Sequence, residues 1–434
     1  MSERSERTVE HSAPQATPAG WRSLAPDLRP LRRHRDLRLL LASRGISFLG
    51  SMVTYVAVPF QVYELTGSTL AVGLVGLGEL VTLLALAFLG GALADAKDRR
   101  LLVLSAEAGL ALCSAVLLGN ALLDRPNVAA VFVVAAVMAG LDAIQRPALE
   151  ALIPRLVDRD ELAATSALSS LEMTVAMVVG PGIAGLLIAT AGLGATFGFD
   201  LATFLLSLVL LSLMKAVPPP EDAERPSLRR VAEGFRYAWS RQELLGSYLV
   251  DVVAMFFGMP FALFPAIADR YGGGGVVGLL YAAPSVGSLL ATLTSGWVPR
   301  VSRYGRAILW AAGAWGVAIV AFGLAPTLPL ALVALVAAGA ADMVSGMFRM
   351  TLWNSTIPDA LRGRLASIEL VSYSSGPLLG NAESGIAASL IGVRGSVVSG
   401  GALCIVGVVA TAVLLPGLAR YDSRRETPLA EVDA

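Results

Sequence analysis

Several ionisable residues lie inside long apolar runs of the chain, where an unpaired charge is costly: Arg44, Glu79, Glu107, Glu172, Asp200, Asp251, Asp342, Glu369 and Glu383. A carboxyl group in such surroundings can bind and release a proton near neutral pH. Glu79 lies about ten residues into its run, close to the middle of a span, and is our first candidate for proton coupling. Asp251 and Glu383 are further candidates. The alternative is that Glu79 pairs with an arginine such as Arg44 and serves structure alone.

Histidine and cysteine are too scarce for several other kinds of site. His11 and His34 both fall in the polar N-terminal segment, so the core contains no histidine for a metal site or a catalytic triad. Cys113 and Cys404 each stand alone in an apolar run, which favours small buried thiols over a zinc cluster or a disulfide framework. We therefore expect neither an enzyme nor a resident metal or cofactor.

Lysine is rarer still relative to arginine. The two lysines are Lys97, followed by Asp98, and Lys215, followed by Ala216, so no Walker A loop can be formed. The formal net charge is zero, and nothing in the sequence indicates nucleic acid as a partner. A nucleotide partner is not expected either, and uphill transport would have to draw on an ion gradient.

The elements that position these residues are membrane-spanning helices. The chain has 434 residues, of which 55% are hydrophobic and only 15% are charged, with a mean hydropathy of +0.69. Soluble domains carry about 25% charged residues, and one spanning helix needs about 20 apolar residues. We predict an all-α membrane protein with twelve transmembrane helices, at about residues 37–63, 69–94, 101–122, 127–146, 164–190, 194–214, 244–268, 275–298, 306–325, 328–350, 365–391 and 395–417.

These runs divide the chain into five parts. Residues 1–36 are polar and predicted to be disordered, and 37–214 form an N-terminal six-helix bundle. Residues 215–243 are a linker whose stretch 228–239 has helical spacing, 244–418 form a C-terminal six-helix bundle, and 419–434 are a tail. The first apolar run is too long for a signal peptide, so we expect a retained first helix.

The loop charges predict the orientation. Arginine and lysine gather at the N-terminus, in the linker, in the tail and in the loops after runs two, four, eight and ten, whereas the opposite side carries only Arg125, Arg270 and Arg394. Basic loops stay in the cytoplasm. We expect a multi-pass protein of the inner or plasma (cell) membrane with both termini, the linker and the tail cytoplasmic.

The two halves of the sequence resemble each other at nearly constant offsets. Ile153-Pro154 recurs as Ile357-Pro358, 204 residues later (153 to 357), and the Gly91 segment after run two matches the Gly296 segment after run eight. Gly180-Pro181 recurs as Gly376-Pro377, 196 residues later (180 to 376). Six helices separate equivalent positions, so the repeats are parallel, a plan used by secondary transporters with a substrate site near the midplane.

The sequence resembles the major facilitator superfamily over residues 37–418. Its segment Gly91-x-Leu93-Ala94-Asp95-x-x-x-Arg99-Arg100 is similar to the helix 2–3 signature of that family, with Asp98 where Gly is commonest. The Asp-Arg-Arg ending and the segment from Gln145-Arg146-Pro147-Ala148 to Arg159-Asp160-Glu161-Leu162 resemble the branch of enterobactin exporters and macrolide efflux proteins. Gly180-Pro181-x-x-Ala184-Gly185 is similar to the helix 5 element of proton antiporters, one Gly short.

The resemblance implies a gating role for a charged cluster at the cytoplasmic ends of helices 2 and 4. Asp95 and Arg99 are four residues apart, as are Asp142 and Arg146, so each pair shares a helix face. In the family such residues latch the two halves on the cytoplasmic side, and Gly91 and Arg100 belong to the same signature. The alternative is that these are ordinary interface charges.

The glycine–proline elements are expected to serve packing, the conformational cycle, or both. Gly180 and Gly185 remove side chains and permit close helix approach, and Pro181 removes one helix hydrogen bond. Gly376 and Pro377 are the corresponding residues of the second half.

We therefore predict a secondary active transporter, without cofactor, powered by the proton gradient. The resemblance implies antiport export of a small amphipathic molecule such as a drug, a siderophore or a secondary metabolite. The expected partners are that small-molecule substrate and the lipid bilayer, and the protein is expected to be a monomer. An importer, a lipid-moving member of the superfamily and a non-transporting membrane sensor remain alternatives.

Overall fold

The computed structural model describes residues 27–96, 98–216, 236–237, 239–357 and 359–424, with side chains given outside 88–97 and 358–374. The described residues are almost wholly helical and contain no strand. Of the predicted linker helix at 228–239, residues 236, 237 and 239 are described and helical, and the rest, like most of the predicted disordered N-terminus, lies outside the described residues. Residues Arg29–Arg33 of that segment form a short helix, α1.

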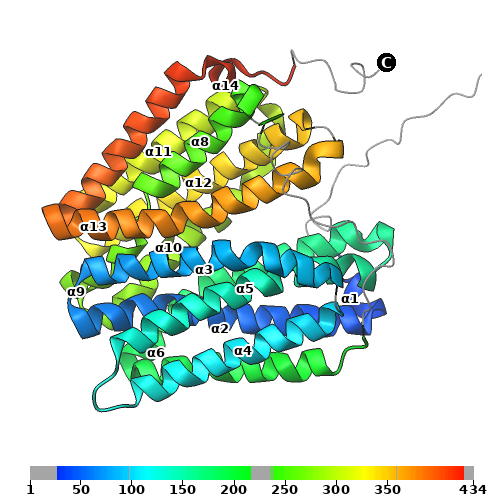
Figure 1. Cartoon of the computed structure of the whole chain (residues 1–434). Coiled ribbons are helices and arrows are strands. Elements are labelled where there is room, and N and C mark those ends of the chain that lie inside the picture. The colour runs from blue at the N-terminus through cyan, green and yellow to red at the C-terminus, as the bar shows by residue number, and fades with distance from the viewer. Residues whose placement is uncertain (1–26, 97, 217–235, 238, 358, 425–434) are drawn as a thin grey trace, which may run out of the picture.

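Two groups of long helices make up the molecule, one from each half of the sequence (Figure 1). The first group comprises α2 (Arg35–Thr66), α3 (Thr69–Ala96), α4 (Arg99–Ala121), α5 (Val128–Leu156) and α6 (Leu162–Ser212). The second comprises α8 (Gln242–Phe257), α9 (Phe264–Tyr271), α10 (Gly274–Leu293), α11 (Tyr304–Leu324), α12 (Leu328–Thr356) and α13 (Asp359–Leu414), followed by the short α14 (Pro416–Arg420).

Glycine breaks divide the two longest helices. Within α6, Gly192 has φ 78° and ψ 178°, and within α13, Gly392 has φ 78° and ψ 160°. Only glycine adopts such angles readily, so the chain leaves one helix and enters the next at a single residue. These breaks fall in the gaps that the sequence predicts between runs 164–190 and 194–214, and between 365–391 and 395–417.

The helices are long and apolar enough to cross a bilayer. Within the described residues, ten helical segments meet that criterion, two of them containing the glycine breaks. Their outward faces carry large apolar side chains, such as Leu112 and Val333 at 66% exposure and Trp310 at 80%. Such an apolar surface fits lipid contact and not water.

Helix boundaries match the predicted runs to within a few residues, with three differences. α5 and α12 extend about one to three turns beyond the predicted 146 and 350, to Leu156 and Thr356. The predicted run 275–298 ends as a helix at Leu293, and residues 295–300 form a 3-10 helix containing Pro299. The run 244–268 is interrupted after Phe257.

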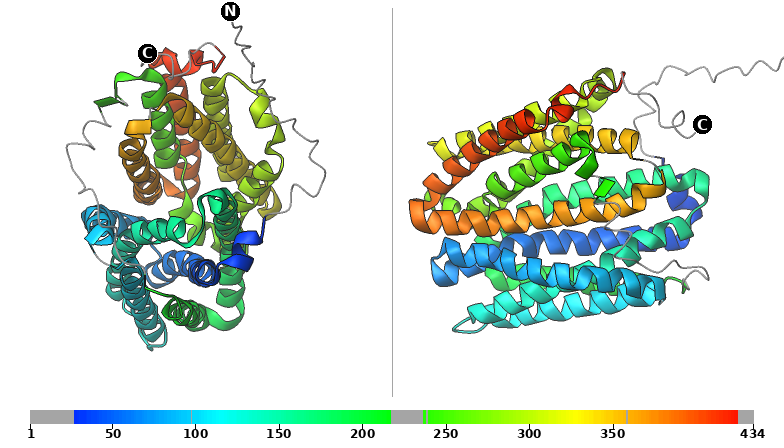
Figure 2. Two further views of the ribbon diagram at one scale, coloured as in Figure 1. Left: turned by 90° about the vertical axis from the view of Figure 1, so that its right-hand side faces the viewer. Right: turned by 45° about the horizontal axis from the view of Figure 1, so that its top comes forward.

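Most of the contact between the halves comes from two helix pairs, α3 with α13 and α6 with α10. α3 and α13 run side by side in both views (Figures 1 and 2). α1 and α14 lie at the same end of the molecule, which we call the basic end because Arg38, Arg100, Arg241 and Arg420 are found there. The other end, where the chain turns at Gly192 and Gly392, is called the distal end.

Candidate transport site and gating residues

Glu79 lies at the junction between the halves. It follows Gly76 of α3 by one turn, and a Cβ on Gly76 would lie 3.0 Å from the carbonyl oxygen of Leu378 on α13. The half-buried carboxyl is within electrostatic range of Tyr281 on α10. Among the described residues, no cation lies within 4.0 Å of it. Arg44 pairs instead with Glu172, with Nε 3.5 Å from Oε1.

Asp251 has a cationic partner inside the C-terminal half. Arg349 of α12 forms an ion pair with Asp251 of α8 through Nη1, and its Nη2 lies 3.9 Å from Oδ1 of Asp342. Only 11% of the Arg349 side chain and 10% of the Asp251 side chain are exposed. One buried guanidinium therefore bridges two carboxylates from two helices.

Glu383 stands apart from these groups. It is partly buried in α13, two residues before Gly385, which contacts Gly73 of α3, and it forms no ion pair with a described residue. The structure thus brings none of the three predicted coupling carboxyls together: Glu79 lies between the halves, whereas Asp251 is engaged by Arg349.

The last residues of the signature, Asp98 and Arg100, follow α3 and connect α4 with α6 at the basic end of the N-terminal half. Asp98 caps α4, and its Oδ1 accepts hydrogen bonds from the backbone N–H groups of Arg100 (2.8 Å) and Leu101 (3.3 Å). The Arg100 guanidinium donates to the carbonyl oxygens of Leu211 (3.0 Å) and Ser212 (2.6 Å) at the end of α6. A cation there also complements the negative end of the helix dipole.

Arg99, in the first turn of α4, contacts α5. Its side chain is buried and donates from Nη1 to the carbonyl oxygen of Ala151 on α5 at 3.1 Å. Gly91 and Asp95 belong to the last turns of α3, and their side chains lie outside the described residues. The predicted latch between Asp95 and its neighbours stays a prediction.

On α5 the predicted pair Asp142–Arg146 is arranged differently. Arg146 Nε lies 3.5 Å from Oε1 of Glu150, one turn further along, and Asp142 is exposed. Asp142 has no ion pair within 4.0 Å among the described side chains. Both acids are four residues from Arg146, so either can occupy the same face, and the pairing depends on rotamers that spacing does not determine.

The glycine–proline element of α6 makes two close contacts. A Cβ on Gly180 would lie 2.5 Å from Cβ of Met52 on α2. One on Gly185 would lie 2.9 Å from Cα of Gly278 on α10, across the junction of the halves. The carbonyl oxygen of Pro181 also approaches Gly278. Small residues thus permit backbone contact between helices.

The second half repeats this arrangement. Gly376, followed by Pro377 within α13, would place a Cβ 3.0 Å from Cβ of Met255 on α8. Further along α13, a Cβ on Gly385 would lie 3.0 Å from Cα of Gly73 on α3. We call the contacts Gly185–Gly278 and Gly385–Gly73 the glycine seams. Both lie toward the distal end, and both join one half to the other.

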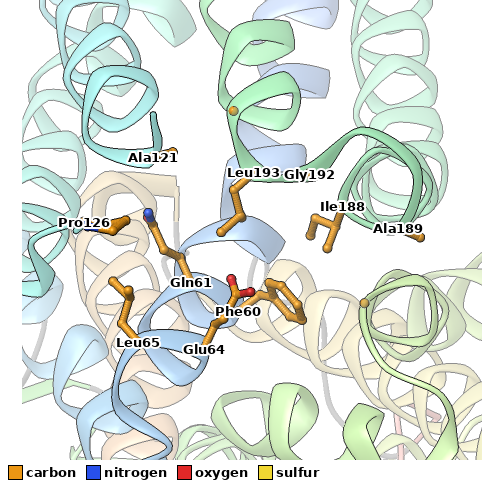
Figure 3. A pocket seen from close by; sticks show the side chains of 12 residues that line it. Phe60, Gln61, Glu64, Leu65, Ala121, Pro126, Ile188, Ala189, Gly192 and Leu193 are labelled. Atoms are coloured by element: carbon orange, nitrogen blue, oxygen red, sulfur yellow. The ribbon is translucent and has the colours of Figure 1, made fainter. Parts of the chain in front are cut away.

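A pocket of about 620 Å³ opens at the distal end. Figure 3 shows the side chains of Phe60, Gln61 and Glu64 extending from α2 toward the turn at Gly192 and Leu193. Gln61 is 1% exposed, and neither its amide nitrogen nor its amide oxygen has a hydrogen-bond partner in the described part of the chain. The pocket borders the seam between α6 and α10.

Two sets of contacts in the site are not predicted from the sequence: those of Arg349 and those of two glycines. The apolar neighbours of Arg349, Phe348 and Met350, indicate an intramembrane charge but do not say which acids it faces. Gly278 and Gly73 were not recognised as contact residues, because small residues are common in membrane helices and the sequence does not say which partner they face.

Comparisons with known proteins agree with this architecture. The family model described as transmembrane secretion effector matches residues 25–433. The enterobactin exporter EntS of Shigella boydii serotype 18 is 32% identical over 415 residues, covering 93% of this chain and 96% of that protein. EntS of Escherichia coli O139:H28 gives the same identity and coverage.

Solved structures share the fold at low identity. The nucleoside transporter NupG has a TM-score of 0.71 and 13% identity, covering 88% of this chain and 99% of that one. A bacterial homologue of the iron transporter ferroportin, in an inward-facing state, has a TM-score of 0.66 and 18% identity, covering 89% of this chain and 99% of that one. The protein is therefore a multi-pass membrane transporter, not an enzyme, and belongs to the transmembrane secretion effector family of the major facilitator superfamily.

Proposed function

We propose that this protein is a proton-driven exporter that alternates between inward and outward openings. The observation that carries the proposal is the 32% identity, over 93% of the chain, to proteins named as enterobactin exporters. By that likeness, the cargo is a siderophore or another small amphipathic molecule, such as a drug or a secondary metabolite. The transporter works as a monomer without a resident cofactor, and the proton gradient supplies the energy.

Twelve spans in two parallel six-helix repeats fit the helix lengths. A straight helix of the 51 residues of α6 would be about 77 Å long, whereas the apolar core of a bilayer is about 30 Å thick. α6 and the 56-residue α13 therefore cross twice each, turning at Gly192 and Gly392. From the charge bias of the loops, we infer that the basic end and both termini face the cytoplasm.

The glycine seams support a conformation closed on the far side of the membrane. Backbone contact at Gly185–Gly278 and Gly385–Gly73 leaves no room for cargo between α6 and α10 or between α13 and α3. Cargo loaded from the cytoplasm requires this arrangement, and release requires the seams to part. Glu79, close to both α10 and α13, is placed where a proton could bias that change.

Cargo accumulation in cells tests the proposal. Cells with and without the protein are incubated with siderophores, antibiotics and dyes, before and after addition of a protonophore. We expect lower accumulation of at least one compound and a return to the control level with protonophore. Higher accumulation would indicate an importer, an effect on labelled lipid alone would indicate lipid transport, and no effect of any probe would favour a membrane sensor.

A further inference from the structure

Two acidic residues are enclosed within the N-terminal half, away from the junction of the halves. Asp200, in the part of α6 after Gly192, is 0% exposed, and Glu107 of α4 is 2% exposed. Both lie inside membrane-spanning helices, where charged groups are rare and functional by default. Neither takes part in the ion pairs or glycine seams described above.

Asp200 joins three helices through one of its oxygens. Its Oδ2 accepts hydrogen bonds from Oγ1 of Thr54 on α2 at 2.7 Å and from Oγ of Ser114 on α4 at 2.6 Å. Its Oδ1 is buried and has no hydrogen-bond partner among the described residues. That oxygen faces Gly50 of α2, where a Cβ would lie 2.7 Å from it.

Glu107 is held in the same way a few turns closer to the basic end. Its Oε1 accepts a hydrogen bond from Oγ of Ser207 on α6 at 2.9 Å, and Ser207 in turn contacts Ser43 of α2 at 2.8 Å. The side chains of Ser47 on α2 and Gln145 on α5 also lie beside this carboxyl. Oε2 is buried without a partner in the described part of the chain.

The groups that face the two acids from the neighbouring helices are hydroxyls and an amide, and the charged group close to Glu107 is Asp200 itself. The cations of α2 and α4 at this level are engaged elsewhere: Arg44 with Glu172, and Arg99 with the carbonyl of Ala151. Two ionised carboxylates would therefore repel each other without a counter-ion, in a medium that solvates charge poorly. Neutral carboxyl groups avoid that cost.

In the C-terminal half, the position that corresponds to Asp200 is packed without an acidic side chain. Gly192 and Gly392 have the same φ of 78° and are 200 residues apart (192 to 392). At that offset Asp200 corresponds to Gly400, where the backbone directly approaches the carbonyl of Phe257 on α8. Nearby, the buried Cys404 thiol donates a weak hydrogen bond to the carbonyl oxygen of Ala312 at 3.8 Å and joins α13 to α11.

We propose that Asp200 and Glu107 form a second proton-binding site, enclosed in the N-terminal half and separate from Glu79. This inference rests on the proton-driven transport proposed above. With protons bound, the hydroxyl contacts hold α2 against α4 and α6. Loss of a proton leaves an uncompensated charge between these helices and loosens α2, which also contacts α9 and α10 of the other half. Proton occupancy inside one half thereby alters the junction between the halves.

Infrared difference spectroscopy of the purified protein in lipid tests the site directly. pH steps are applied to the wild type, Asp200→Asn and Glu107→Gln. Asp160→Asn, at an exposed position of the 3-10 helix Arg159–Glu161, is the matched control. We expect the C=O stretching band of protonated carboxyls to lose one component in each of the first two variants and none in the control. Unchanged bands in both would show that neither acid exchanges a proton over this pH range and would overturn the proposal.

Transport by the same variants gives the second readout. Asp200→Asn and Glu107→Gln preserve side-chain size and should still export cargo, with loss of part of the pH dependence of the rate. A rate with unaltered pH dependence, or one that depends on Na⁺ in place of protons, would overturn the site. If wild-type export is insensitive to protonophore, the proposed proton-driven function fails, whereas the infrared result still decides whether the two carboxyls hold protons.

Discussion

Gly185 of α6 and Gly278 of α10 bring the two halves of the transporter into backbone contact. A Cβ on Gly185 would lie 2.9 Å from Cα of Gly278, so neither position has space for a side chain. The corresponding contact of Gly385 with Gly73 joins α13 to α3. Closure of the distal end therefore depends on the absence of side chains at four positions.

Gly278→Val should prevent that closure. The added side chain meets backbone atoms of Pro181 and Gly185, which cannot move aside as a flexible side chain can, and overpacking of this kind costs about 1–3 kcal/mol. We expect export to fall strongly at normal protein levels, with increased labelling of engineered cysteines near the distal end by a membrane-impermeant reagent. Gly182→Ala, which has nothing within 4 Å of its Cβ, is the control. Equal loss of export in both variants would contradict the seam.

Glu79→Gln should abolish gradient-driven export while protein levels stay normal. Glutamine has nearly the same shape but cannot exchange a proton, so the coupling step is lost and the fold is not. The measurement is protonophore-sensitive cargo export, with Asp160→Asn as a control outside the spans. Retention of coupling in Glu79→Gln would remove this residue from the mechanism.

Arg349→Ala should destabilise the C-terminal half. It leaves Asp251 without its cation in a site where only 10% of that side chain is exposed, and breaking a buried pair typically costs about 3–5 kcal/mol. The double variant Arg349→Ala with Asp251→Asn should recover much of the loss, because it leaves no unpaired charge. Thermal unfolding in detergent measures both, and a double variant as unstable as the single one would argue against the pairing.

Asp98→Ala should weaken the start of α4. Loss of the cap leaves the N–H groups of Arg100 and Leu101 without their acceptor, at a cost of about 1 kcal/mol. Asp98→Gly introduces the residue that is commonest at this position of the family signature, and it should lower the free energy of unfolding by only a few tenths of a kcal/mol. Unfolding midpoints compare the two, and equal losses would show that the cap contributes little.

Asp95→Asn should slow turnover more than it weakens cargo binding, because the gating role implied by the family signature concerns the conformational change. Export rates and cargo affinity measured on the same preparation separate the two effects. A change confined to affinity would assign Asp95 to the cargo site.

The amino-acid sequence by itself determined the class of structure and the approximate position of the apolar runs, including the short gaps in which Gly192 and Gly392 lie. A bilayer demands about 20 apolar residues per crossing, and that demand is local, so the runs around Gly192 and Gly392 are evident without coordinates. The signature from Gly91 to Arg100 and the Gly180-Pro181 element also indicated the family, which the comparisons confirm.

Only the tertiary structure decided which side chains meet. Arg44 lies with Glu172 and not with Glu79, Arg349 joins Asp251, and Asp200 collects hydroxyls from Thr54 and Ser114. These partners come from helices far apart in the sequence, and helical periodicity fixes the face of a residue only within its own helix. The rotation of one helix against another is set by packing, here by glycines that permit contact at a few positions, and packing is a property of the assembled bundle.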